Sequence, residues 1–92
     1  MKNADTRHGM HLALKEHIAS GNPVTRLEAL VFFGVANLPD TIANLRKDGW
    51  VITKTTVSFA KAVNRINKHM VFKAPRDLPI REIQLTEYQA TL

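Results

Sequence analysis

Two helix-start signals lie close together in the first half of the sequence, with a glycine between them. The first is a capping box, because the Thr25 side chain can accept a hydrogen bond from the N–H of Glu28 while the Glu28 carboxylate accepts one from Thr25. The second has Asn37 as a cap and Pro39 in the first turn, where a missing N–H costs nothing. Gly34 can end the first helix in the left-handed conformation. The pattern predicts short helices over about residues 26–33 and 38–48.

A longer helix is predicted before this pair. Met10, Leu14 and Ile18 recur at helical spacing, and the pattern ends at Gly21. The prediction is a helix over about residues 7–20. Two short helices with a tight glycine-containing connection, behind a longer first helix, form a helix-turn-helix.

The hydrophobic period changes after Gly49. β-Branched and aromatic residues dominate residues 50–57 and 69–73, which predicts two strands joined by a basic connection around residues 61–68. A helix is the alternative here, because apolar residues also recur at helical spacing. These residues are Phe59, Val63, Ile66 and Met70. We expect the hairpin.

The length and composition fit one globular domain. The chain has 92 residues, of which 45% are hydrophobic and 23% are charged. The predicted order of three helices followed by a hairpin is that of a winged helix-turn-helix, a mainly α fold with a small β-hairpin as its wing. We expect residues 1–76 to form this domain and residues 77–92 to form a tail. The apolar residues of the tail either complete the core or form a homodimer contact through residues 80–92.

Positive charge is concentrated in one part of the chain. The whole sequence carries a net charge of +5, yet residues 46–76 hold eight Lys and Arg residues and a single acid, Asp48. Such an asymmetry is typical of a protein that binds a polyanion, most simply nucleic acid. A solvated basic surface is the alternative.

Three stretches of the sequence carry a family resemblance. Residues 20–30 read SGNPVTRLEAL, residues 33–34 read FG, and residues 42–52 read IANLRKDGWVI. They match the pattern S-G-x-x-[IV]-T-x-x-E-A-L, F-G and I-x-x-L-R-x-x-G-x-x-I, so the chain resembles the small phage and prophage helix-turn-helix proteins over about half of its length. The resemblance implies a DNA-binding winged helix, acting as a transcriptional regulator or as an architectural factor of the excisionase kind.

The chain departs from that family pattern at three positions. Asn37 and Thr41 stand where arginines are common, and Trp50 stands where a histidine is usual. These departures fall on surfaces that select a target, so the resemblance implies no particular DNA sequence. They also keep a second function class open, in which the fold is a protein-interaction module that binds a host protein through its basic wing.

The second short helix of a helix-turn-helix enters the major groove of double-stranded DNA with the face opposite its buried stripe. With Leu38, Ile42 and Leu45 buried, the outward face consists of Asn37, Asp40, Thr41, Asn44 and Lys47. Asn44 can pair with adenine, Thr41 can contact a thymine methyl group, and Lys47 can contact phosphate. Asp40 would repel phosphate, so it is either a helix-start acid or a contact to a cytosine amino group. The alternative is an ordinary solvated helix face.

The predicted wing supplies further contacts to the DNA backbone or minor groove. Arg65 is central in the basic connection and is the candidate for insertion into the minor groove. The predicted DNA-binding residues are Asn37, Thr41, Asn44, Lys47, Lys54, Lys61, Arg65 and Lys68. Trp50 is expected in the hydrophobic centre rather than at the DNA, together with Phe32, Phe33, Phe59 and Phe72.

Other function classes find little support in the sequence. The absence of cysteine excludes disulfides, thiolate metal sites and a cysteine nucleophile. His8 and His11 are spaced as a pair but lack a third ligand, and the acids are dispersed, so we expect no enzyme, metal or cofactor. No apolar run is long enough for a membrane span, and the start lacks a signal-peptide core. We therefore expect a cytoplasmic protein of a bacterial host cell, associated with the nucleoid when bound to DNA.

Overall fold

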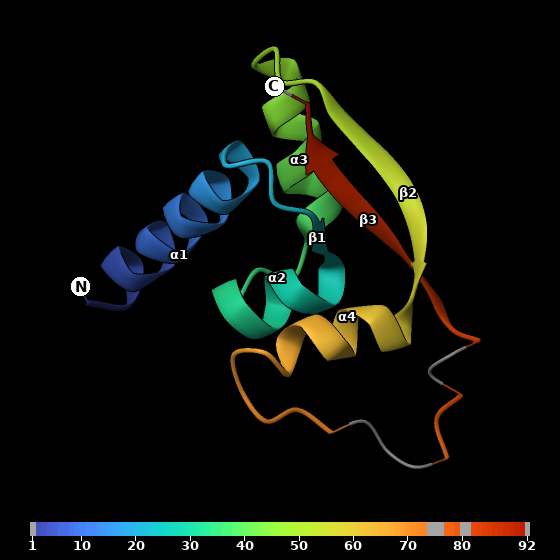
Figure 1. Cartoon of the computed structure of the whole chain (residues 1–92). Coiled ribbons are helices and arrows are strands. Elements are labelled where there is room, and N and C mark those ends of the chain that lie inside the picture. The colour runs from blue at the N-terminus through green and yellow to red at the C-terminus, as the bar shows by residue number, and fades with distance from the viewer. Residues whose placement is uncertain (1, 74–76, 80–81, 92) are drawn as a thin grey trace.

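Helices and a small antiparallel sheet make up the computed structural model, which describes residues 2–73, 77–79 and 82–91 (Figure 1). The elements in chain order are α1 (Lys2–Ala19), β1 (Val24–Thr25), α2 (Arg26–Phe33), α3 (Leu38–Lys47), β2 (Ile52–Ser58), α4 (Phe59–Ile66) and β3 (Gln84–Ala90). None of the described helices combines the length and the apolar character needed to cross a bilayer.

The local signals at the helix-turn-helix form as predicted. The Thr25 hydroxyl accepts a hydrogen bond from the N–H of Glu28 at 3.3 Å, and the N–H of Thr25 donates to the Glu28 carboxylate at 3.1 Å. Gly34 ends α2 in the left-handed region, with φ of 64°. Asn37 caps α3 by accepting from the N–H of Asp40 at 3.3 Å. These contacts confirm the two helix starts and the short connection between α2 and α3.

The sheet has the strand order β1-β3-β2, and both pairings are antiparallel. β3 is the central strand: its Ala90 lies opposite Ile52, and its Tyr88 lies between Val24 of β1 and Lys54 of β2. The last part of the chain, which the sequence analysis sets apart as a tail after residue 76, thus supplies a strand to the same sheet as β1 and β2. Ile80, Arg81 and Leu92 of the predicted dimer contact lie outside the described residues, and pairing of the tail with a second protomer stays a prediction.

The predicted hairpin between β2 and residues 69–73 is wrong. Residues 59–66 form helix α4, as the alternative pattern indicated, and β2 pairs with the distant β3 instead. The Ser58 side chain caps α4 by accepting from the N–H of Lys61 at 3.2 Å. Ala62, Val63 and Ile66 are buried on the inner side of the helix. A short amphipathic helix thus lies within the wing, in place of the expected basic connection.

The hydrophobic core is aliphatic rather than aromatic. Its members come from every part of the helix-turn-helix and from the sheet: Leu14, Ile18, Val24, Ala29, Val35, Leu38, Ile42, Leu45, Ile52 and Ala90. Phe33, Trp50 and Tyr88 are only partly buried and pack against this cluster. The expectation that the large aromatics form the hydrophobic centre is wrong, because the branched aliphatic side chains of α1 and α3 already fill it.

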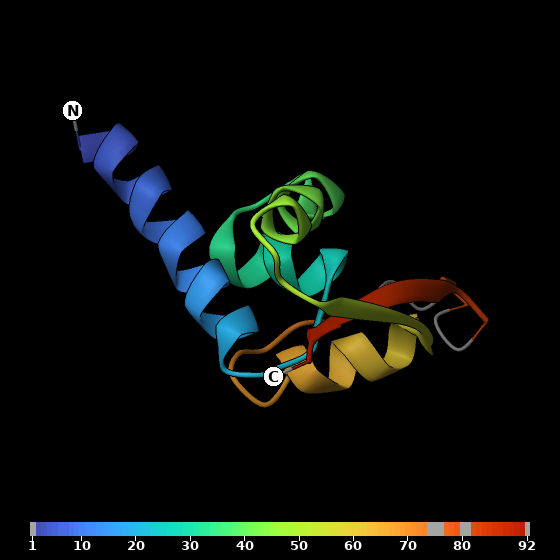
Figure 2. The ribbon, with the colours of Figure 1, turned by 90° about the horizontal axis from the view of Figure 1, so that it is seen from above.

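The sheet separates α3 from α4. Seen from above, α3 and α2 lie on one side of the β2–β3 ribbon and α4 lies on the other (Figure 2). The strand register agrees with this arrangement. Ile52 and Ala90 lie on the sheet face that packs against α3 in the core, whereas Glu87 lies on the opposite face and contacts Arg65 of α4. Any residue of β2 or β3 can therefore be assigned to the α3 side or the α4 side by its register.

Candidate nucleic-acid interface

The outward face of α3 is mostly polar. Leu38, Ile42 and Leu45 are buried, with exposed fractions of 0%, 1% and 5%. The opposite face carries the five predicted residues, of which Thr41 is half-buried and the others are exposed: Asn37, Asp40, Thr41, Asn44 and Lys47. The side-chain oxygen of Asn37 is already used as the helix cap, so its amide NH₂ group is what it can offer to a ligand. The structure thus brings the helix-derived candidates onto one surface.

The C-terminal end of α3 is fixed to the start of β2. The Arg46 guanidinium donates to the backbone oxygen of Ile52 at 2.8 Å, and the N–H of Trp50 donates to the oxygen of Leu45 at 3.1 Å. The Lys15 ammonium of α1 lies 5.9 Å from the centre of the Trp50 ring, at cation–π distance. These contacts fix the orientation of α3 relative to the sheet. A helix that contacts base edges needs such a fixed orientation.

Lys54 lies on the same side of the sheet as α3. It is exposed on β2 opposite Tyr88, and it shares its sheet face with the buried Ile52. Because alternate residues of a strand share a face, its side chain leaves the sheet toward α3 rather than α4. Lys47 and Lys54 are therefore the predicted cations that accompany the outward face of α3.

Lys61 and Lys68 belong to a different surface. Lys61 is exposed on α4, and Lys68 is exposed in the turn that follows this helix, on the far side of the sheet from α3. The predicted set of basic contacts is thus divided in two by the sheet. The sequence reading could not show this division, because it assumed one hairpin beside α3.

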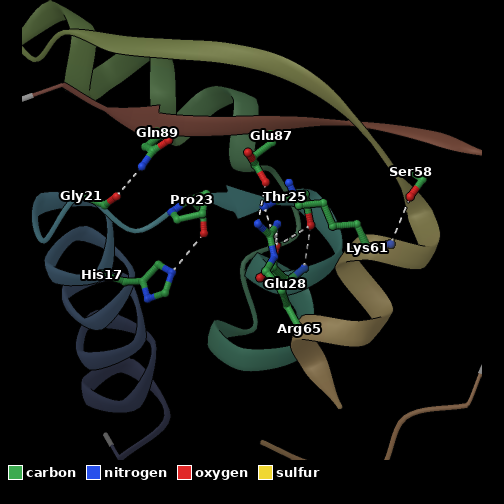
Figure 3. Close-up of polar contacts among 10 residues, drawn as sticks. All are labelled: His17, Gly21, Pro23, Thr25, Glu28, Ser58, Lys61, Arg65, Glu87 and Gln89. Carbon is green, nitrogen blue, oxygen red and sulfur yellow. Dashed lines mark hydrogen bonds and ion pairs between the residues drawn. The ribbon is translucent and has the colours of Figure 1, made fainter. Parts of the chain in front are cut away.

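Arg65 occupies a site that the sequence reading missed. One guanidinium nitrogen donates to the Glu28 carboxylate at 2.5 Å and another donates to the Glu87 carboxylate at 2.5 Å (Figure 3). The side chains of Arg65, Glu28 and Glu87 are 20%, 6% and 10% exposed. Burial acts to lower the pKa of Arg65, but the two carboxylates outweigh it and raise that pKa above its usual value. Arg65 is therefore charged and tied into the domain.

The expectation that Arg65 enters a minor groove rested on a hairpin that the chain does not form. In the structure Arg65 lies on the inner side of α4 and joins three elements: α2 through Glu28, β3 through Glu87, and α4 itself. Glu28 also accepts from the Thr25 hydroxyl at 3.0 Å, so the capping box and the ion pairs form one network. No local pattern in the sequence predicts this network, because Arg65 is 37 residues from Glu28 and 22 residues from Glu87.

One comparison with known proteins decides the family. A family model described as a winged helix-turn-helix domain matches residues 12–71, which is more than half of the chain. The chain belongs to the winged helix-turn-helix family. A search of curated proteins and a search of solved structures each gave no match.

The architecture of this winged helix-turn-helix domain agrees with the family match. Winged helix-turn-helix domains typically bind DNA, and in such domains the second helix of the motif, which corresponds to α3 here, enters the major groove. The matched region ends before β3, although β3 supplies the central strand of the sheet. The wing of this winged helix-turn-helix thus consists of β2 and β3 with α4 inserted between them.

Among residues 2–73, 77–79 and 82–91, no three His, Asp or Glu side chains gather as a metal site. Of the two histidines that the sequence spaced as a pair, His11 is exposed, and the side chain of His8 lies outside what the structure describes.

Proposed function

We propose that this winged helix-turn-helix protein binds double-stranded DNA through the exposed face of α3, with Lys47 and Lys54 on the flanking phosphates. The observation that supports this most strongly is the arrangement of α3 itself, with one face buried in the core and the other exposed and mostly polar. Such a helix can lie in a major groove without exposing any of the core.

The roles within this surface follow from side-chain chemistry. Asn44 lies in the middle of the exposed face and has the donor and acceptor pair that an adenine edge requires. Thr41 is half-buried, so only its outer atoms are available, which suits contact with a thymine methyl group. Asp40 at the start of α3 interacts favourably with the helix dipole, and its carboxylate can accept a hydrogen bond from a base amino group but would repel a phosphate. We assign to the protein the role of a phage-type transcriptional regulator or an architectural factor of the excisionase kind.

Salt dependence tests the duplex contact. On B-DNA the slope of log K against log salt is about −0.9 for each neutralised phosphate. The Lys47→Gln and Lys54→Gln variants should therefore each make the slope about 0.9 less steep on any duplex, measured by fluorescence anisotropy of a labelled DNA. Lys61→Gln, which removes an exposed charge on α4, across the sheet from α3, is the matched control and should leave the slope unchanged. A slope near zero for the unaltered protein would refute duplex binding.

Base reading is tested separately with Asn44→Ala. A preferred site is first selected from a pool of random duplexes, and binding is then compared on this site and on random DNA. The variant should lose about 1–3 kcal/mol on the preferred site and little on random DNA, because Asn44 contacts a base rather than a phosphate. Equal losses on both DNAs would mean that α3 does not read sequence.

A further inference from the structure

A surface hollow lies beside α4, away from the exposed face of α3. Two adjoining pockets of about 530 and 200 Å³ share four lining residues: His17, Asn22, Phe32 and His69. Phe33 completes the larger pocket, and Lys68 and the Glu28–Arg65 ion pair line the smaller one. The larger volume lies within the range of pockets that hold small ligands. The proposed duplex surface uses none of these side chains.

The larger pocket is lined by planar rings. The Phe32 ring meets the His69 ring edge-to-face at 5.5 Å and the Phe33 ring edge-to-face at 6.3 Å, and the His17 ring lies 5.4 Å from that of Phe33. Asn22 is exposed at this pocket and offers an amide that can both donate and accept. Aromatic faces with one amide at the edge are the chemistry that holds an unpaired nucleobase.

The pocket is held in shape before any ligand arrives. His17 donates from Nε2 to the backbone oxygen of Pro23 at 3.3 Å, which fixes its ring beside the pocket (Figure 3). In the turn after α4, the N–H of His69 donates to the oxygen of Ile66 at 3.0 Å, and the N–H of Phe72 donates to the Asn67 side chain at 2.8 Å. The rim that carries His69 and Lys68 is thus held by hydrogen bonds from backbone N–H groups.

A basic track leads along α4 to this pocket. Lys61, Asn64 and Lys68 are exposed and are spaced to share the outer face of the helix and its following turn. Residues 59–73 contain no acid, and the two glutamates that approach α4 from α2 and β3 are both occupied by Arg65. No acid within residues 59–73 therefore neutralises the positive charge of this face, and such a face attracts a polyanion.

We infer that the face formed by α4 and the aromatic pocket binds single-stranded nucleic acid, with one unpaired base against Phe32 and His69 and the neighbouring phosphates on Lys68 and Lys61. A duplex fits poorly because its bases are stacked inside and cannot enter a pocket. A strand is favoured over a free nucleotide because Lys61 lies near the start of α4, seven residues before Lys68, where only a continued backbone would meet it. This inference is independent of the duplex contact proposed for α3, since the two surfaces share no residue.

The test uses the full chain and a labelled single-stranded oligothymidylate, with fluorescence anisotropy as the readout. Phe32→Leu keeps an apolar side chain but removes the ring, and it should weaken strand binding about fivefold or more. The Lys61→Gln and Lys68→Gln variants should each make the salt slope about 0.7 less steep, the value for a single strand. Asn44→Ala and Lys47→Gln on α3 are matched controls and should leave strand binding unchanged.

Three results would overturn the inference. Strand affinity that Phe32→Leu leaves unchanged, with the variant folded by circular dichroism, would show that the pocket holds no base. If an unlabelled duplex displaces the labelled strand at the same concentrations at which the duplex binds α3, one surface binds both nucleic acids. Thymidine monophosphate binding as tightly as the strand would assign the pocket to a free nucleotide. Failure of duplex binding alone would refute the α3 proposal and leave this one standing, because the two readouts use different DNAs and different variants.

Discussion

Replacing Arg65 with alanine is expected to lower the free energy of unfolding by about 3–5 kcal/mol. The substitution leaves the carboxylates of Glu28 and Glu87 buried without their cation, and a charge left unpaired in a protein interior is strongly destabilising. Typical domains are stable by only about 5–15 kcal/mol, so much of the protein would unfold at moderate temperature. Urea unfolding monitored by circular dichroism gives the measurement.

Two variants separate the ion network from simple loss of a side chain. Lys61→Ala changes an exposed cation on the same helix and should cost about 0.5 kcal/mol or less. The triple variant Glu28→Gln, Arg65→Ala, Glu87→Gln removes the charge from both acids, and glutamine still satisfies the capping box, so it should be more stable than Arg65→Ala alone. A loss below about 1 kcal/mol in Arg65→Ala would show that the network contributes little.

The pH dependence of this contribution has a definite sign. The pKa of Arg65 is raised in the folded protein, so its stabilisation is complete below the ordinary arginine pKa and is lost only as the pH rises through the raised value. We therefore expect the destabilisation of Arg65→Ala to be the same at pH 7 and pH 9, measured by the same unfolding experiment. A difference between these two pH values would point to another titrating group.

Deleting residues 79–92 is expected to abolish cooperative folding. The deletion removes β3, the central strand, so β1 and β2 lose their pairing partner and Arg65 loses Glu87. It also removes Ala90 from the core and the hydrogen bond from the Gln89 side chain to the oxygen of Gly21 at 2.8 Å. A thermal scan of the truncated chain by circular dichroism should show no sharp transition.

Complementation provides the control for this deletion. A synthetic peptide of residues 79–92, added in excess, should restore a cooperative transition, because the missing strand can pair between β1 and β2. A truncated chain that stays folded and monomeric while the full chain is dimeric by analytical ultracentrifugation would contradict this prediction. That result would instead support self-association through the tail.

The start of α2 and the start of α3 show what local sequence can predict. Thr25 with Glu28, and Asn37 with Pro39, satisfy helix-end N–H groups from within a few residues, so their effect does not depend on the rest of the fold. The buried stripe of α3 and its polar opposite face follow from the helical period alone. For this reason the helix-turn-helix, and the α3 part of the candidate site, could be predicted from the sequence.

Residues 57–70 show where local sequence is ambiguous. β-Branched residues favour a strand up to Val57, and the apolar spacing from Phe59 onward fits a helix, so both readings were available for the same stretch. Capping by Ser58 and burial of Ala62, Val63 and Ile66 favoured the helix. That burial exists only because α2 and the sheet provide a surface for α4 to cover.

The sequence by itself determined the helix-turn-helix, the polar face of α3 and the excess of positive charge in residues 46–76, because capping, periodicity and composition are properties of neighbouring residues. Only the tertiary structure decided that β3 pairs with β2, that Arg65 lies between Glu28 and Glu87, and that α4, which carries Lys61, lies across the sheet from α3. These features join positions far apart in the chain, and their free energy comes from burial and pairing that exist only once the sheet has formed.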